Sequence, residues 1–326
     1  MQTGTSLEWL LEGFRYDLEA TTKPKTVEFY CGHVQRFLRW AQAAGIPSET
    51  RLIEKRHIQS FFHHLLQSTE TAVGGNGSRR LLQRTERTRW PYYRSLRRFL
   101  GWAVKEGYLK HNPMDGIVLK APKNPLIEPY RPEHIDRMLD VLERDWQIAT
   151  TLRQKMLAAR DRAVLSLFLE SGLRCGEMVN LALRDGDFQR QSVLVREGKM
   201  GKGRIVGFGP QTKKALWRYL SLRPAEVHGD AMWITEEGRP MALEGIRQII
   251  RRLKRDAGLQ CIKGSVHKLR HTFATSYLRH TRDMKGCRLL LGHSSLTMVE
   301  RYTQFIEAED ALKAYDGRGP LDWLAE

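Results

Sequence analysis

The sequence predicts two folded units, an all-α N-terminal unit of four helices and an α+β C-terminal unit that is mainly helical with a small antiparallel sheet. Its 326 residues exceed one typical domain, since domains run to roughly 100–200 residues each. Apolar residues recur at helical spacing through residues 1–116, whereas helical and alternating stretches mix beyond them. The 41% of hydrophobic residues suffices for a core in each unit.

Four apolar stripes predict the helices of the N-terminal unit, and four amphipathic helices can enclose one small core. The stripes are Leu7, Leu10, Leu11, Phe14 and Leu18; Val27, Tyr30, Val34, Phe37, Leu38 and Ala41; Ile58, Phe61, Phe62 and Leu65; and Leu96, Phe99, Leu100, Ala103 and Val104. Between the third and fourth stripes, three glycines in residues 71–78 predict a mobile loop.

A cluster of prolines predicts the boundary between the units. Pro122, Pro125, Pro129 and Pro132 fall within residues 117–132 and each disfavours helix around it. The predicted organisation is therefore a helical domain over 1–116, an extended linker over 117–132 and a second domain over 133–326.

The second unit alternates between two periodicities. Residues 158–170 and the chain from Leu243 onwards have helical spacing, whereas residues 192–196 and 204–208 alternate as strands do. The two short strands flank a glycine-punctuated turn at 198–203, which predicts a hairpin.

Charge points to nucleic acid as the partner. Lys and Arg number 54 against 37 Asp and Glu, a formal net charge of +17. Residues 79–98 hold eight arginines, one glutamate and three large aromatic residues, and arginine suits phosphate contacts. The candidate DNA-contacting residues here are Arg79, Arg80, Arg84, Arg87, Arg89, Arg94 and Arg97. A merely solvated basic surface is the alternative.

Other classes of protein fit the sequence poorly. No run reaches the ~18 apolar residues of a membrane span, and the N-terminus carries acid where a signal peptide carries base. We therefore expect a soluble cytoplasmic protein with no membrane partner. The four cysteines are scattered without a C-x-x-C pair, which predicts buried thiols and neither a disulfide framework nor a zinc site. They are Cys31, Cys175, Cys261 and Cys287.

Polar residues in the second unit stand where a core would not require them. Arg174 lies in SGLRCGEMVNL, where Gly172 can end one helix and Cys175 can begin another. An arginine at such a junction can reach a ligand, although taken singly it is more often a partner in a surface salt bridge. Lys199 and Lys202 lie at the predicted hairpin tip, from which an ammonium can reach a phosphate. The spacing of a nucleotide-binding P-loop is absent there.

A second group of candidates follows. His267 and Arg270 are three residues apart in SVHKLRHTFATSYL and share one face of a predicted helix. His271 completes the i, i+4 spacing of a zinc pair, but the glutamate of H-E-x-x-H is missing, so no metal is predicted. His293 closes LLLGH, and Tyr302 follows nine positions later at the end of a predicted helix. A phenol of pKa about 10 needs cations or a base nearby to become a nucleophile.

The order of these residues resembles the tyrosine recombinase or phage integrase family, in its simple two-domain, Xer-like form. The matching features are Arg174 in GLRxGE, Lys199 in a GK turn, His267-x-x-Arg270, Leu-Leu-Gly-His293 and Tyr302. The segment LRRFLGWAVKEGYLKHNP resembles the end of that family's core-binding domain. Two glycines depart from the family pattern, Gly207 after the second strand and Gly286 before His293, and residues 140–161 are longer than in compact relatives.

The resemblance implies a chemistry for each residue. Tyr302 would attack a DNA phosphate, giving a 3′-phosphotyrosyl bond and a free 5′-hydroxyl with no ATP, metal or cofactor. The implied roles are a phosphate clamp for Arg174 and Arg270, general acid for Lys199, proton removal for His267, and a phosphate hydrogen bond for His293. Glu177 would orient His267 or Arg174. Lys202 is the alternative to Lys199 and otherwise a DNA contact.

The resemblance also implies partners. Family members act as four protomers on two specific duplex sites and exchange strands through a Holliday junction, which implies association with the nucleoid. Residues 307–326 resemble the tail that docks on a neighbouring protomer, and a tail folded on its own domain is the alternative. No additional N-terminal arm-binding domain is expected. Two other functions stay open: a type IB topoisomerase or telomere resolvase, and a DNA-binding protein that has lost activity.

Overall fold

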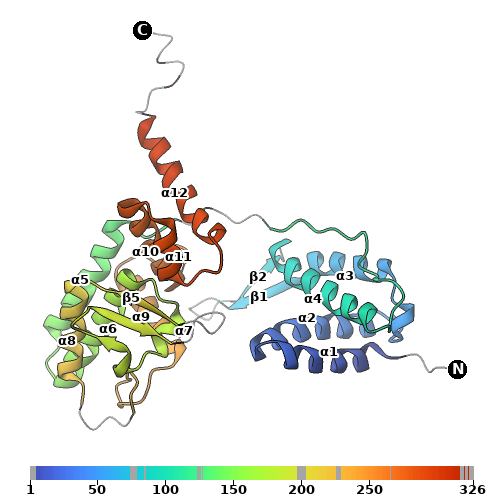
Figure 1. Ribbon diagram of the computed structural model, residues 1–326, viewed down its shortest axis with the longest axis horizontal. Coiled ribbons are helices and arrows are strands. Elements are labelled where there is room, and N and C mark those ends of the chain that lie inside the picture. Colours follow the sequence, from blue (N-terminus) through green and yellow to red (C-terminus); the bar gives the residue numbers. More distant parts are fainter. Residues whose placement is uncertain are drawn as a thin grey trace. The chain divides into compact units, whose positions relative to one another are not determined.

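The computed structural model describes residues 5–73, 79–83, 86–122, 126, 128–196, 203–224, 229–264, 266–315, 319 and 322. The chain divides into two compact units, Met1–Asn124 and Pro125–Glu326, each with its own core. Figure 1 shows a helical first unit and a second unit in which helices surround a small sheet. The predicted fold class is confirmed.

The first unit contains the four predicted helices and one short ribbon. Its elements are α1 (Leu7–Thr21), α2 (Pro24–Ala43), η1 (Thr50–Leu52), α3 (Lys55–Gln67), β1 (Thr69–Val73), β2 (Arg79–Gln83) and α4 (Glu86–Lys105). The predicted stripes face inward, and aromatic rings such as Phe14 and Phe99, with centroids 5.4 Å apart, fill the core.

The ribbon corrects one expectation. Residues 71–73, predicted as loop, belong to β1, which pairs antiparallel with β2 in a register that sets Thr71 opposite Leu81. The first part of the arginine-rich segment is therefore a strand. Thr69, Thr71 and Val73 are β-branched and favour extended backbone, a preference that the neighbouring glycines obscured.

The second unit is mainly helical. Its elements are α5 (Pro132–Ile148), α6 (Leu152–Ser171), α7 (Cys175–Val179), η2 (Leu183–Asp185), β3 (Gly186–Asp187), β4 (Ser192–Val195), β5 (Arg204–Gly207), α8 (Pro210–Leu222), α9 (Leu243–Asp256), α10 (Val266–Thr281), α11 (Met284–Leu291) and α12 (Thr297–Ala314). The sheet has the order β3-β4-β5 and is antiparallel throughout. The predicted hairpin of β4 and β5 is confirmed, while β3 was not predicted.

Helix α6 runs through the middle of this unit and is largely buried from Met156 to Ser171, as its consecutive apolar residues require. Ala163, Val164, Leu165, Leu167 and Phe168 have no exposed surface. The long 140–161 segment contains the end of α5 and the start of α6. Residues 149–151 separate the two helices, and the Thr151 side chain caps the start of α6.

The last three helices pack together and carry Tyr302. This residue lies in the second turn of α12 rather than at a helix end, which corrects the expectation from the sequence. A Cβ at Gly286 in α11 would meet the far ends of the Asp283 and Tyr277 side chains, so a larger residue there would require the Asp283 carboxylate, which caps the helix, to shift. Figure 1 shows the C-terminal part of α12 extending away from α10 and α11.

The structure also bears on the cysteines and on membrane-spanning helices. All four cysteines are free, with Cys31 and Cys287 buried as expected but Cys261 exposed. None of the helices in the described ranges combines the length and apolar character needed to cross a membrane.

We expect Leu165→Ala to lower the free energy of unfolding by about 2–5 kcal/mol, because it leaves a cavity beneath a side chain with 0% exposure. Leu152→Ala, at the exposed first turn of the same helix, should change it by less than about 0.5 kcal/mol. Urea denaturation of both variants checks this, and equal losses would show that α6 is not the centre of the core.

Candidate active site

Arg174 is placed by two helix ends, as the sequence predicts. Gly172 ends α6 with φ of +61°, and a Cβ there would lie 2.3 Å from the Phe273 ring, so a side chain fits neither the conformation nor the space. Arg174 then caps α7, and its backbone N–H donates to Glu177 Oε2 at 2.8 Å. Its guanidinium also donates to Glu177 Oε1 at 2.8 Å.

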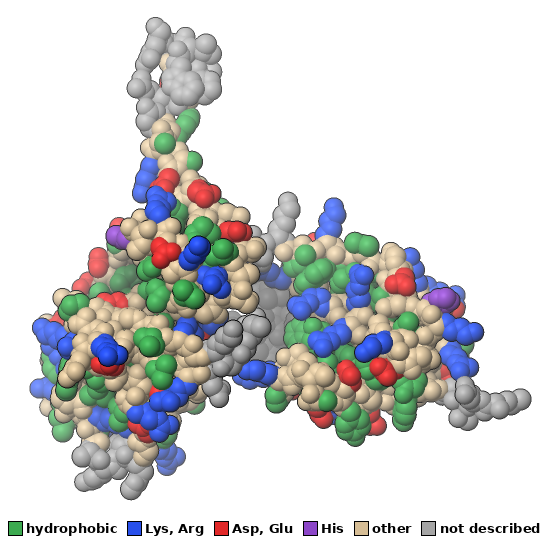
Figure 2. All heavy atoms as spheres, in the orientation of Figure 1, with side chains coloured by type: hydrophobic (Ala, Val, Ile, Leu, Met, Phe, Trp, Pro, Cys, Tyr) green, Lys and Arg blue, Asp and Glu red, His purple; other side chains and the backbone are tan. Residues whose placement is uncertain are grey.

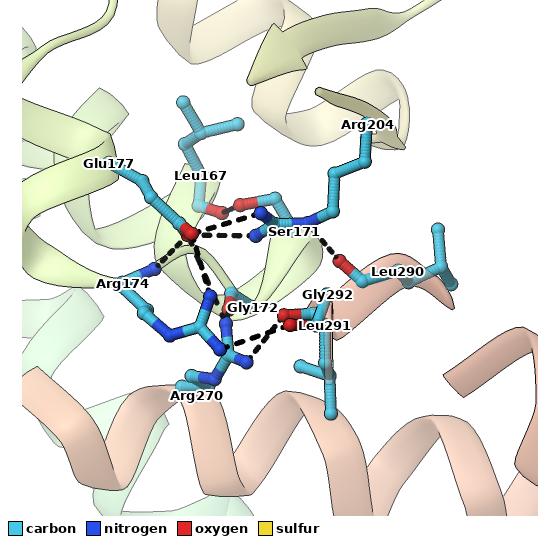
Figure 3. Close-up of polar contacts among 10 residues, drawn as sticks. All are labelled: Leu167, Ser171, Gly172, Arg174, Glu177, Arg204, Arg270, Leu290, Leu291 and Gly292. Atoms are coloured by element: carbon cyan, nitrogen blue, oxygen red, sulfur yellow. Dashed lines mark hydrogen bonds and ion pairs between the residues drawn. The ribbon is translucent and has the colours of Figure 1, made fainter. Parts of the chain in front are cut away.

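Glu177 binds a second arginine that sequence reasoning did not single out. Arg204, the first residue of β5, donates from Nη1 and Nη2 to the two carboxylate oxygens at 2.9 and 2.7 Å. Arg270 Nη1 lies 4.0 Å from Glu177 Oε2. The carboxylate therefore lies among three guanidiniums, as Figure 3 shows.

Arg270 is held from the opposite side by backbone carbonyls. It donates to Gly172 O at 2.7 Å and to Leu291 O at 2.6 Å, and its exposure is only 1%. Burial lowers the pKa of Arg270 to about 10, with the Arg174 charge acting in the same direction and Glu177 opposing both. The side chain is still charged at neutral pH.

The carboxylate responds to the same neighbours. Burial alone would raise the pKa of Glu177, but hydrogen bonds from Arg204 and from the Arg174 backbone outweigh it and lower the pKa to about 2. Glu177 is therefore ionised at neutral pH. The cluster keeps a net positive charge suited to an anion.

Tyr302 lies beside histidines within the same unit. Its Oη is 3.1 Å from His271 Nδ1, and its ring stacks on that of His293 with centroids 6.2 Å apart. The His267 and His271 rings meet edge to face at 4.7 Å. Tyr302 is only 3% exposed, so its hydroxyl is covered in this conformation.

Burial shapes the titration of all four groups. It raises the pKa of Tyr302, which Arg270 opposes. It lowers the pKa of His271 to about 3, reinforced by His267, and lowers that of His293 to about 3, reinforced by Arg270. The pKa of His267 is lowered by burial and by Arg270. Each imidazole is therefore neutral at pH 7 and has one nitrogen able to accept a proton.

The structure brings most predicted site residues of the second unit together. The residues in this neighbourhood are Arg174, Glu177, His267, Arg270, His293 and Tyr302. Glu177 contacts Arg174, one of its two predicted partners. Lys199 and Lys202 fall outside the described residues, as does all of 197–202.

The arginines of the first unit vary in setting. Arg94 and Arg97 lie exposed on α4 and donate to the hydroxyls of Tyr30 and Tyr93 at 3.4 and 2.6 Å. Arg87 is exposed, and Arg89 forms an ion pair with Glu86 at 3.6 Å. The side chains of Arg79 and Arg80 lie outside the described part of the chain, and so does the whole of Arg84.

Two residues of the site were missed for identifiable reasons. Arg204 follows the GK turn directly, but only the fold shows that β5 brings it to Glu177. His271 was considered solely as half of a zinc pair, although H-x-x-R-H places it one turn from His267. Over the described residues, no group of three His, Cys, Asp or Glu side chains could hold a metal ion.

A tyrosine hydroxyl beside imidazoles, next to an arginine cluster, defines the class of enzymes that use tyrosine as a nucleophile towards phosphate esters. The sequence model of the phage integrase family matches residues 131–309 of this chain. The chain belongs to the phage integrase family.

Sequence similarity to known tyrosine recombinases extends over most of the chain. It is 30% identical over 317 residues to the tyrosine recombinase XerC of Pseudomonas aeruginosa, covering 96% of this chain and 94% of that protein. It is 29% identical over 294 residues to tyrosine recombinase XerC 2 of Ralstonia nicotianae, covering 88% and 78%.

A solved structure agrees in fold. The XerH site-specific recombinase bound to its palindromic difH substrate superposes with a TM-score of 0.70 at 20% identity, covering 94% of this chain and 84% of that one. A lambda integrase dimer bound to a COC' core site gives 0.65 at 16% identity, covering 92% and 77%. At these identities, the likeness is one of fold.

We expect Glu177→Gln to destabilise the folded protein by about 3–5 kcal/mol near pH 7, because it leaves buried guanidiniums without their carboxylate. A folded pKa of about 2, below the ordinary 4.5, means that the carboxylate stabilises the fold above pH 4.5 and loses this effect as pH falls towards 2. The difference between wild type and variant should therefore shrink from pH 6 to pH 2.5 in chemical denaturation.

Glu133→Gln, on the exposed first turn of α5, is the control. Its difference from wild type should stay small at both pH values. A Glu177→Gln difference that does not change with pH would contradict the assignment of a low pKa to this carboxylate.

Proposed function

We propose that this protein is a site-specific recombinase that cleaves and rejoins duplex DNA, with Tyr302 as nucleophile. The observation that carries the proposal is the Tyr302 hydroxyl at 3.1 Å from His271 Nδ1 and within reach of the charge of Arg270, which belongs to the cluster with Arg174 and Glu177. Membership of the phage integrase family supports it, as do relatives named tyrosine recombinase.

The reaction exchanges one phosphate ester for another. Tyr302 Oη forms a bond to a backbone phosphorus while the bond to the 5′ oxygen breaks, leaving a 3′-phosphotyrosyl enzyme and a 5′-hydroxyl. A 5′-hydroxyl from a second duplex then attacks the same phosphorus and releases the tyrosine. The same cleavage and rejoining of the other strands, through a Holliday junction, completes recombination without ATP or a cofactor.

The two arginines differ in how they can act on the phosphate. The Arg174 side chain is 27% exposed and can donate directly to a non-bridging oxygen. Arg270 has 1% exposure and is fixed by two carbonyls, so it stabilises the developing charge through its field unless the site opens. We assign Lys199 as general acid for the 5′ oxygen, with Lys202 as the alternative, and His293 as a hydrogen-bond partner of the phosphate.

Proton removal from Tyr302 has a shorter route than the sequence suggested. His271 is in hydrogen-bond contact with the phenol, whereas the contact of His267 is with His271. We propose that His271 accepts the phenol proton and that His267 supports it. Because Tyr302 is 3% exposed, DNA binding must uncover it, with a movement of the start of α12 as the simplest means.

The remaining parts follow from the same proposal. Residues 1–116 would be a DNA-binding domain, 117–132 a linker and 133–326 the catalytic domain. Lys and Arg side chains lie on both units in Figure 2, as expected if both contact DNA. Four copies would act on two sites. The last part of α12 is exposed at Leu312 and Tyr315 and is available to a neighbouring copy, so we favour docking in trans.

We expect Tyr302→Phe to abolish the covalent adduct on nicked duplexes that carry a site selected from random DNA, because the variant lacks the nucleophilic oxygen. Tyr315→Phe, at the other end of α12, should form as much adduct as wild type. Denaturing gels measure both, and an adduct with Tyr302→Phe would identify another nucleophile. Junction resolution between two sites, rather than supercoil relaxation alone, separates a recombinase from a topoisomerase.

We expect Arg94→Gln and Arg97→Gln each to weaken DNA binding and to lower the slope of log affinity against log salt by about 1, since each would lose one phosphate contact. Their tyrosine partners hold both guanidiniums in place before DNA arrives. Arg15→Gln removes the same charge from the exposed face of α1 and should leave the slope unchanged. Fluorescence anisotropy over a salt series checks this, and wild-type slopes for Arg94→Gln and Arg97→Gln would remove α4 from the interface.

A further inference from the structure

Three consecutive carbonyls at the end of α11 each accept a hydrogen bond from a different arginine. Leu290 O accepts from Arg204 Nε at 2.6 Å, as the first of the three. The other two bonds run from Arg270 Nη2 to Leu291 O at 2.6 Å and from Arg174 Nη2 to Gly292 O at 3.3 Å. Figure 3 shows the three side chains converging on this helix end, which leads directly into His293.

Helix ends explain why cations gather here. The last carbonyls of a helix have no partner within it and carry the negative end of its dipole, so they favour cations. Three guanidiniums this close also repel one another, and Glu177 offsets part of that repulsion. The carbonyls and the carboxylate together fix where the guanidiniums lie.

Arg204 uses every donor nitrogen of its side chain in this arrangement. Nε binds Leu290 O, while Nη1 and Nη2 form a fork with the two oxygens of Glu177. The side chain also lies against Gly292, where a Cβ would be 3.1 Å from Nη1. With only 9% of its side chain exposed, Arg204 is poorly placed to meet a DNA phosphate itself.

The fork has a consequence for Arg174. A carboxylate held at both oxygens cannot rotate, and these same oxygens bind the backbone and guanidinium of Arg174. Arg174, the arginine proposed to contact the phosphate directly, is therefore oriented through Glu177 by a residue on β5.

We propose that Arg204 is a positioning residue for phosphate activation: it fixes Glu177 and the end of α11, and through them Arg174 and His293. The inference rests on the proposed function and adds a residue to it. Lysine cannot replace Arg204 in this role, because a single ammonium cannot donate to Leu290 O and to both carboxylate oxygens with the planar geometry of the fork.

The test compares Arg204→Lys with wild type in single-turnover cleavage of nicked duplexes carrying the selected site, at saturating protein. Misplacement of a reacting group by a fraction of an ångström to one ångström costs roughly 10–100-fold in rate. We expect adduct formation to slow by about that factor, with DNA affinity within about twofold of wild type because the positive charge is retained.

A second substrate separates positioning from a general loss of structure. A methylphosphonate at the scissile position lacks one anionic oxygen, so its cleavage depends less on correctly placed guanidiniums. The defects of Arg204→Lys and Arg174→Lys should both shrink on this substrate, each measured against wild type on the same DNA. A defect caused by misfolding would be equal on both substrates.

Arg160→Lys is the matched control. Arg160 forms a buried ion pair with Asp161 and donates to Ile234 O, and its side chain is 10% exposed, close to the 9% of Arg204. It lies in the N-terminal half of α6, about 18 Å along the helix from Gly172 at 1.5 Å per residue. This variant should lose stability in thermal unfolding yet cleave at the wild-type rate.

The outcomes distinguish the two proposals. If wild type cleaves the DNA and the Arg204→Lys rate is within about twofold of the wild-type rate, the positioning role is overturned and the proposed function stands. The same holds if the defect of Arg204→Lys is equal on the two substrates. A wild type that forms no adduct through Tyr302 overturns the proposed function and the positioning role with it.

Discussion

One buried carboxylate holds the site together. Glu177 has 8% of its side chain exposed and binds Arg174 and Arg204 directly, with Arg270 at 4.0 Å. Without it, three guanidiniums would be brought out of water next to one another, at a cost that a protein rarely sustains. With it, three positive charges against one negative charge leave the cluster cationic, which a phosphodiester can neutralise.

The backbone completes what the carboxylate begins. Arg270 donates two short hydrogen bonds to Gly172 O and Leu291 O, at the ends of α6 and α11. Such carbonyls are free because helices leave their last acceptors unpaired. Gly172 can end α6 in the left-handed conformation only because it lacks a side chain, and that turn brings Arg174 to the same place. The site is therefore built from helix ends, whose unpaired carbonyls are available as hydrogen-bond acceptors.

Local patterns predicted much of this structure. The helices of both units follow from apolar spacing, the β4–β5 hairpin from alternation around a glycine turn, and the α6–α7 junction from Gly172. The site residues in motifs were found because each lies in a short, distinctive context. The β1–β2 ribbon was missed since glycines outweighed the β-branched residues beside them.

Contacts between distant segments could not be predicted in this way. Arg204 and Glu177 are 27 residues apart, and Arg204 and Leu290 are 86 apart. Nothing in either local sequence specifies the pairing, which depends on how β5 packs against α11. His271 shows a different failure: its spacing from His267 suited a metal pair, and only the packing of α10 on α12 reveals its contact with Tyr302.

Because the histidines are neutral, their ability to accept a proton depends on whether the substrate is bound. Burial lowers the pKa of His271 and of His293 to about 3, reinforced by neighbouring imidazoles and arginines, so neither competes strongly for the proton of Tyr302. Under the proposed function, a bound phosphodiester adds negative charge beside the same arginines. An anion favours the protonated imidazole and raises its pKa, while the arginines that opposed it become neutralised. His271 would thus become a better proton acceptor only when a phosphate is present, and the nucleophile would be activated where there is a bond to cleave.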